Sequence, residues 1–120
     1  MANQCVWFDI PVVDLDRAIK FYSAVLGEPI RKETFPGMTF GLLPHEGEEV
    51  GGCLVVMENG KPSDQGPLLY LNAKGRLDAA ITAAQSNGGK VLQAKHQIGP
   101  YGYKAVILDS EGNRIALHSM

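Results

Sequence analysis

Side chains that could bind or activate a small molecule alternate along strand-like segments at both ends of the chain. Trp7 and Asp9 lie on one face of the segment 5–11, and Arg114 and His118 alternate near the other end. An aspartate could accept a proton, and an arginine could hold a carboxylate or phosphate through two hydrogen bonds. The opposite face of the first segment is apolar and is expected to cover a core; it consists of Val6, Phe8, Ile10 and Val12.

Each of these polar or aromatic residues also has a structural interpretation. Trp7 could pack into the fold instead of stacking on a ligand. Asp9 could form a purely structural pair with Arg114 or His118. A catalytic role would need a geometry that the sequence does not show. Arg114 could be an exposed residue at a strand end, and His118 could lie on the surface near the chain end. Asp9 and His118 are therefore weak catalytic candidates.

A second group of candidates lies in the connection "KHQIGPYGYK", which contains His96, Tyr101 and Tyr103. Tyrosine and glycine at the mouth of a pocket combine a stiff amphipathic surface with a mobile backbone, which favours ligand contact. The same glycines suit an ordinary hairpin turn, so both interpretations stay open. His45, in "LLPHEGEE", is expected to be a solvated loop residue, with a role in a lid as the alternative.

The elements that would position these residues repeat once along the chain. "LDRAI" at 15–19 matches "LDAAI" at 77–81, and Gly27 and Gly89 follow the two segments at the same offset. Apolar residues at helical spacing predict a helix in each half, ended by these glycines. A strand precedes each helix, and further strands are expected at 30–34, 38–43, 52–58, 91–95, 103–109 and 114–119.

Each half therefore has the order βαβββ, which predicts an α+β fold. We expect one domain over residues 1–120, with module one at about 1–60 and module two at about 65–120. Two such modules side by side would form a curved eight-stranded mixed sheet around a cup, with the helices outside. Alternation would place these residues on the inner faces: Trp7, Asp9, Leu68, Tyr70, Asn72, Arg114, Ala116 and His118.

The segments "IPVVDLDRAIKFYSAVLG", "LDAAI…NGGKV" and "AVILDSEGNRIALHS" resemble the vicinal oxygen chelate superfamily, which includes glyoxalase I, bleomycin-resistance proteins and extradiol dioxygenases. In its metal-using branches, the resemblance implies a ligand on each of four strands facing the cup. Three of those positions fall here on Trp7, Leu68 and Ala116, and the fourth falls within 53–55, where there is no carboxylate. Because indole, isobutyl and methyl groups cannot coordinate such cations, we expect no metal ligands and no cofactor.

Three functions follow from this interpretation. The first is a metal-independent apolar pocket that binds a small organic molecule. The second is an enzyme: either a divergent metal-dependent lyase or dioxygenase, or a metal-free isomerase or lyase using Asp9 or His118. A divalent metal is expected only if its ligands are displaced to other residues, such as His45, His96, His118, Glu58 and Asp9. The third is a regulatory or partner-binding module.

Composition limits the partners and the location. A net charge of −2 and scattered basic residues give no electrostatic case for nucleic acid or an anionic membrane. No apolar stretch approaches the roughly 20 residues of a membrane-spanning helix. Cys5 and Cys53 form neither a disulfide framework nor a metal motif, so we expect two buried, reduced thiols in a cytoplasmic protein. The resemblance implies a homodimer.

Overall fold

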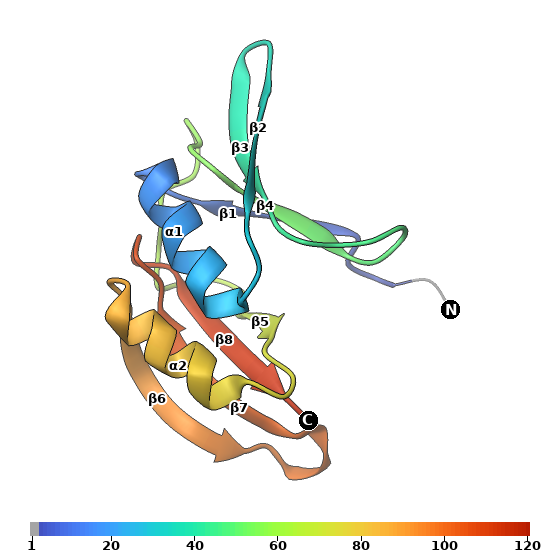
Figure 1. Ribbon diagram of the computed structural model, residues 1–120, viewed down its shortest axis with the longest axis vertical. Helices are drawn as coiled ribbons and strands as arrows, with labels where there is room; N and C mark the ends of the chain where they lie inside the picture. Colours follow the sequence, from blue (N-terminus) through green and yellow to red (C-terminus); the bar gives the residue numbers. More distant parts are fainter. Residues whose placement is uncertain (1–2) are drawn as a thin grey trace.

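The computed structural model describes residues 3–120 and contains two βαβββ modules in succession (Figure 1). The first module comprises β1 (Trp7–Pro11), α1 (Leu15–Leu26), β2 (Arg31–Phe35), β3 (Met38–Leu42) and β4 (Gly51–Val55). The second comprises β5 (Leu69–Asn72), α2 (Leu77–Ser86), β6 (Lys90–Gln97), a short 3₁₀ turn (Gly99–Tyr101), β7 (Tyr103–Leu108) and β8 (Arg114–Ser119). The predicted α+β fold is confirmed.

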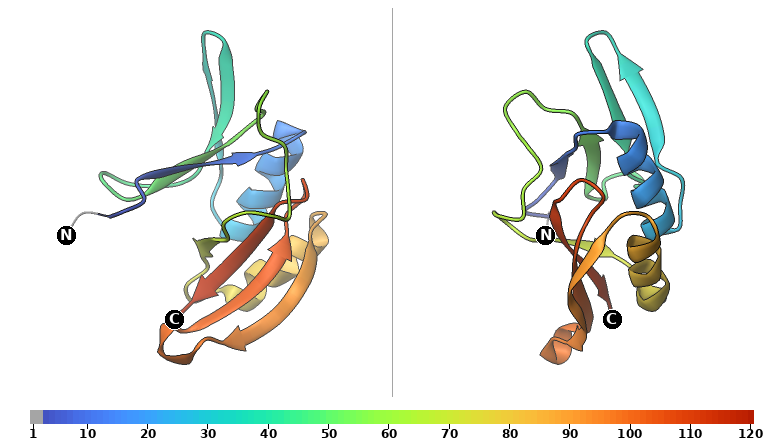
Figure 2. Two further views of the ribbon diagram at one scale, coloured as in Figure 1. Left: turned by 180° about the vertical axis from the view of Figure 1, so that it is seen from behind. Right: turned by 90° about the vertical axis from the view of Figure 1, so that its left-hand side faces the viewer.

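Both modules have the same strand order. The strands lie in two four-stranded mixed sheets, β1-β4-β3-β2 and β5-β8-β7-β6, each with one parallel pair and two antiparallel pairs. The β2–β3 hairpin projects away from the body of the molecule, and neither sheet closes on itself (Figures 1 and 2). The first strand of each module, β1 or β5, is an edge strand of its sheet, and residues of both strands line one cavity.

The structure corrects some of the predicted strand positions. The strand predicted at 52–58 is β4, and it ends at Val55. The strand predicted at 91–95 extends over 90–97 as β6, with irregular register against β7. Val6, which was expected to cover the core, precedes β1 and is 72% exposed. The sheet offers it no partner strand, because pairing between β1 and β4 begins at Trp7.

Helix α1 follows directly from its sequence. Asp14 has extended backbone and accepts a hydrogen bond from the Arg17 backbone N–H at 3.0 Å, which makes it the N-cap. The buried stripe consists of Ala18, Phe21, Tyr22 and Val25. Gly27 ends the helix in the left-handed conformation, with φ of 72°. The side chains of this stripe join the single large core that both modules share.

Module two supplies charged groups to both ends of α1. The Glu111 carboxylate, from the β7–β8 turn, accepts hydrogen bonds from the Val13 and Asp14 backbone N–H groups at the N-terminus. Arg76, which precedes α2, donates to the Val25 carbonyl at the C-terminus. A negative group at the N-terminus and a positive group at the C-terminus both stabilise the helix dipole. These contacts, together with packing of α1 on α2, set the relative position of the two modules (Figure 2).

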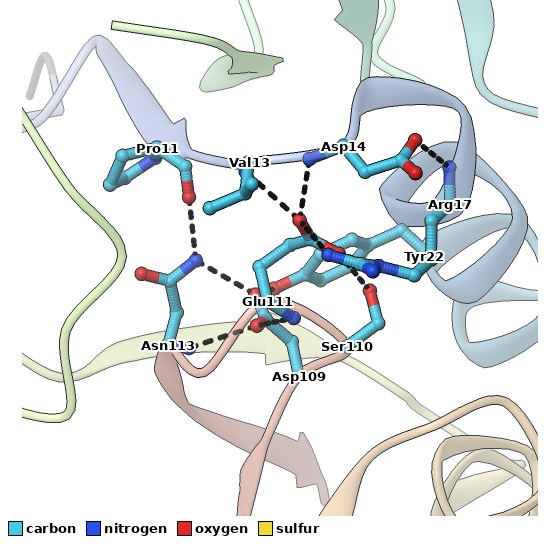
Figure 3. Close-up of polar contacts among 9 residues, drawn as sticks. All are labelled: Pro11, Val13, Asp14, Arg17, Tyr22, Asp109, Ser110, Glu111 and Asn113. Carbon is cyan, nitrogen blue, oxygen red and sulfur yellow. Dashed lines mark hydrogen bonds and ion pairs between the residues drawn. The ribbon is translucent and has the colours of Figure 1, made fainter.

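The β7–β8 turn carries a buried network of carboxylates that joins the modules (Figure 3). Glu111 also accepts a hydrogen bond from the Arg17 guanidinium at 2.7 Å, and the Glu111 side chain is completely buried. Asp109 accepts from the Tyr22 hydroxyl at 2.5 Å and from the side-chain amide of Asn113 at 3.0 Å. Asn113 in turn donates to the Pro11 carbonyl at 2.8 Å. The end of β1 is thereby fixed to the start of β8.

Within residues 3–120, no helix combines the length and the apolar character that crossing a membrane requires.

Candidate functional site

Two glycines of β4 give room to the aromatic residues of β1. Trp7 pairs with Gly51 and Phe8 pairs with Gly52 in the parallel ladder. A Cβ atom at Gly51 would lie 2.7 Å from the Trp7 ring, and one at Gly52 would lie 2.5 Å from the Phe8 ring. The His45 ring meets Trp7 edge to face, with centroids 5.8 Å apart. The Gly-Gly pair therefore sets the positions of both aromatic rings.

Asp9 is held by two neighbours on the face of the sheet opposite α1. Its Oδ1 atom accepts from Trp7 Nε1 at 3.0 Å and from the Cys53 thiol at 3.2 Å. The structural pair predicted for Asp9 with Arg114 or His118 is therefore wrong, because Trp7 and Cys53 are closer and on the same sheet. Both donors therefore bind the same carboxylate oxygen, Oδ1.

The two cysteines differ in accessibility. Burial, and then the hydrogen bond to Asp9, raise the pKa of the Cys53 thiol to about 12. Cys53 is therefore a neutral donor and not an activated nucleophile. Cys5, which was expected to be buried, is exposed. It lies before β1, outside the paired part of the sheet.

In module two, the corresponding face carries a separate polar cluster. The Lys104 ammonium donates to the Tyr70 hydroxyl at 2.9 Å. His118 Nε2 lies 2.6 Å from the Tyr101 carbonyl, and its ring is 6.2 Å from that of Tyr70. His118 is thus a half-buried strand residue with a definite partner, and the interpretation of it as a loose surface histidine is wrong.

The remaining predicted binding residues add no further side-chain hydrogen bond to the His118, Tyr70 and Lys104 side chains. His96 is exposed on β6, and its Nδ1 atom lies 2.9 Å from the Ala94 carbonyl, two residues away. Tyr101 is 72% exposed in the 3₁₀ turn, and Tyr103 is 41% exposed. Ala116 is completely buried, because Tyr70 and Val106 flank it in the ladder.

Two cavities lie between the modules, and Phe8 lines both of them. The larger, of about 430 Å³, contains two glutamates and two of the predicted residues, Tyr70 and Asn72. The smaller, of about 290 Å³, contains the predicted residues Asp9 and Arg114 and is called the Arg114 cavity below. The Arg114 cavity is lined by Phe8, Asp9, Ile10, Pro11, Lys61, Ser63, Gln65, Pro67, Leu69, Asn113, Arg114 and Ile115.

One wall of the Arg114 cavity is the connection 56–68 between β4 and β5. Ser63 N–H donates to the Asn113 side chain at 3.1 Å, and the Ser63 carbonyl accepts from Arg114 N–H at 3.3 Å. Arg114 Nη2 donates to the Gly66 carbonyl at 2.9 Å. Lys61, Ser63 and Gln65 were not among the binding residues predicted from the sequence. The length of this connection was the available signal, since connections longer than about 12 residues are often functional.

The architecture and the sequence point to the same family. A model of the Glyoxalase/Bleomycin resistance protein/Dioxygenase superfamily matches residues 4–117. The chain belongs to this superfamily. The resemblance to the vicinal oxygen chelate proteins is thereby confirmed. No curated protein gives a significant match to the chain.

Solved structures from this superfamily share the fold at low sequence identity. A glyoxalase/bleomycin resistance protein from Albidiferax ferrireducens superposes with a TM-score of 0.76 and 23% identity, over 98% of this chain and 99% of that one. A superfamily enzyme from Burkholderia phytofirmans superposes at 0.69 with 18% identity, over 94% and 95%. A glyoxalase I variant from Zea mays superposes at 0.69 with 21% identity, over 95% of this chain and 45% of that one.

The residues of this chain do not fit the metal that the superfamily implies. Trp7 and Leu68, the first-strand positions, stand two residues before Asp9 and Tyr70. Asp9 pairs with Cys53 in module one, as Tyr70 pairs with Ala116 in module two. Cys53 is therefore the counterpart of Ala116 and the fourth ligand position. Cys53 offers one sulfur there, and its thiol donates a hydrogen bond to Asp9, whereas a metal site needs three or four converging donors. The other three positions have no donor atoms.

A displaced set of ligands is not assembled within one chain either. Among residues 3–120, no three His, Cys, Asp or Glu side chains come close enough to hold one ion. This includes the displaced ligands considered from the sequence: Asp9, His45, Glu58, His96 and His118.

Proposed function

We propose that the protein binds a small organic molecule in the region between its modules, without a metal ion. The Arg114 cavity carries this proposal. Apolar side chains form much of its lining, and a few polar groups converge on it, as is usual for small-molecule sites. The absence of donor atoms at three of the four superfamily ligand positions supports binding that does not depend on a metal.

Thermal stability in the presence of a metabolite panel tests this proposal. A ligand that binds only the folded state raises its stability by RT ln(1 + [L]/Kd). The panel includes bleomycin, because relatives are named as bleomycin resistance proteins. We expect at least one organic ligand to stabilise the protein equally with and without a chelator such as EDTA. The proposal is wrong if no compound stabilises the protein, or if stabilisation requires an added divalent metal.

We also propose that the protein is a homodimer. Large apolar side chains are exposed on the projecting hairpin and on the sheet faces opposite the helices, and a second copy would cover them. Phe35 is 57% exposed, Met38 46%, Trp7 44% and Tyr70 49%. Light scattering after size exclusion would give twice the chain mass for the wild type and one chain mass for Phe35→Asp. A wild-type monomer would contradict the proposal. A cytoplasmic location is also proposed, supported by two free cysteines.

A further inference from the structure

The Arg114 cavity contains more positive charge than the protein neutralises. Arg114 and Lys61 both line it, and the four ion pairs found among residues 3–120 involve neither of them. Arg114 Nη2 donates to the Gly66 carbonyl, but the buried Nε atom has no acceptor. A buried donor without an acceptor is unfavourable, most of all on a charged group. An anionic acceptor bound in the cavity would satisfy it.

The rest of the lining indicates what that anion carries. Phe8, Ile10, Leu69 and Ile115 present apolar surface from both modules to the same cavity. A volume of about 290 Å³ lies at the lower limit of ligand pockets, which hold about 300–1,000 Å³. The cavity therefore suits a small molecule with one apolar group, and it is too small for a large drug.

Asp9 limits the number of charges. Asp9 is one of the residues that line the cavity, and hydrogen bonds from Trp7 Nε1 and the Cys53 thiol to its Oδ1 atom hold the carboxylate in place. It is the one acidic residue among those that line the cavity. A second negative charge on the ligand would share this partly apolar cavity with the negative charge of Asp9, and like charges repel more strongly in such a space than in water.

We propose that the Arg114 cavity binds a small monocarboxylate with an apolar body. The carboxylate lies between Arg114 Nε and the Lys61 ammonium, and the apolar body lies between β1 and β5. Asp9 excludes ligands with a second carboxylate. This inference names the ligand class for the proposed function and rests on it.

Titration with phenylacetate tests the inference, with phenylacetamide as the neutral compound of the same shape. Calorimetry measures affinity, and fluorescence of the single tryptophan, Trp7, reports on the neighbourhood of Asp9. We expect phenylacetate to bind about ten- to a hundredfold more tightly than phenylacetamide, because only the carboxylate forms charge-assisted hydrogen bonds. Equal affinities, or no binding of phenylacetate, would overturn the inference. The proposed function would still be tested separately, by thermal stability against the metabolite panel.

Variants locate the binding. Lys61→Gln removes an exposed ammonium that makes no ion pair with another described residue, so we expect a folded protein with about tenfold weaker phenylacetate binding. Arg114→Gln is expected to weaken binding at least as much. Lys20→Gln, an exposed change on α1, is the matched control and should bind phenylacetate as the wild type does. Wild-type affinity in Lys61→Gln would overturn the inference.

Selection against a second charge is tested with 4-carboxyphenylacetate. The wild type should bind it more weakly than phenylacetate, and Asp9→Asn should reduce this difference. An unchanged difference in Asp9→Asn would overturn the role of Asp9.

Discussion

Replacing Glu111 with glutamine should destabilise the protein in a pH-dependent way. Burial alone would raise the pKa of this carboxyl, but hydrogen bonds from Arg17, from the Asp14 and Val13 backbone N–H groups and from Ser110 lower it from 4.5 to about 2. The difference corresponds to about 3 kcal/mol at neutral pH. Because Arg17 is 52% exposed and its attraction is screened, we expect a measured loss of about 2 kcal/mol in Glu111→Gln.

The sign of the pH dependence follows from the lowered pKa. The ionised carboxylate stabilises the folded state fully above the unfolded pKa of about 4.5, and this stabilisation is lost as the pH falls toward about 2. Urea unfolding of the wild type and Glu111→Gln should therefore differ most near neutral pH and converge in acid. The exposed Glu48→Gln change is the control and should have little effect.

Two results would refute this reasoning. A Glu111→Gln variant as stable as the wild type at neutral pH would show that the carboxylate does not join the modules. A loss of equal size at every pH would show that packing, and not charge, is responsible.

Three further predictions concern the core and the site. Tyr22→Phe should lower the free energy of unfolding by about 1–3 kcal/mol in urea titrations, because a buried carboxylate loses its hydroxyl donor; an unchanged midpoint would contradict this. Gly51→Ala should shift the fluorescence of Trp7 because the new methyl group would overlap its ring, and an identical spectrum would mean that the ring lies elsewhere. At neutral pH a thiol reagent should modify the exposed Cys5 quickly. It should modify Cys53 only after unfolding, because Cys53 is buried and its pKa is raised to about 12. Fast modification of both thiols in the folded protein would show that Cys53 is not buried.

The module architecture was predictable because its signals are local. The spacing of Ala18, Phe21, Tyr22 and Val25 specifies the buried face of α1, and Gly27 marks its end. The repetition of the same pattern after residue 65 is enough to predict the second module. The alternation of polar and apolar residues also separated Trp7 and Asp9 from Phe8 and Ile10, which pack with the buried residues of α1.

The partners of the site residues were not predictable, because they depend on contacts between distant segments. Asp9 meets Cys53 only through the register of β1 against β4, which no local pattern specifies. Glu111 lies in a turn that the sequence marks clearly, but its role depends on the N-terminus of α1, 97 residues away from it in sequence at Asp14. The attachment of the connection 56–68 to β8 has no periodic signal at all.

The central claim is that this member of the superfamily binds its ligand without a metal ion, and elemental analysis tests it most directly. The protein would be purified without chelators, equilibrated with zinc, nickel, manganese and iron(II), desalted and measured. We expect well below one equivalent of any metal per chain, because Trp7, Leu68 and Ala116 offer no ligand atoms and Cys53 alone cannot hold a cation. One tightly held equivalent per chain that disappears on Asp9→Ala or Cys53→Ala substitution would contradict the account.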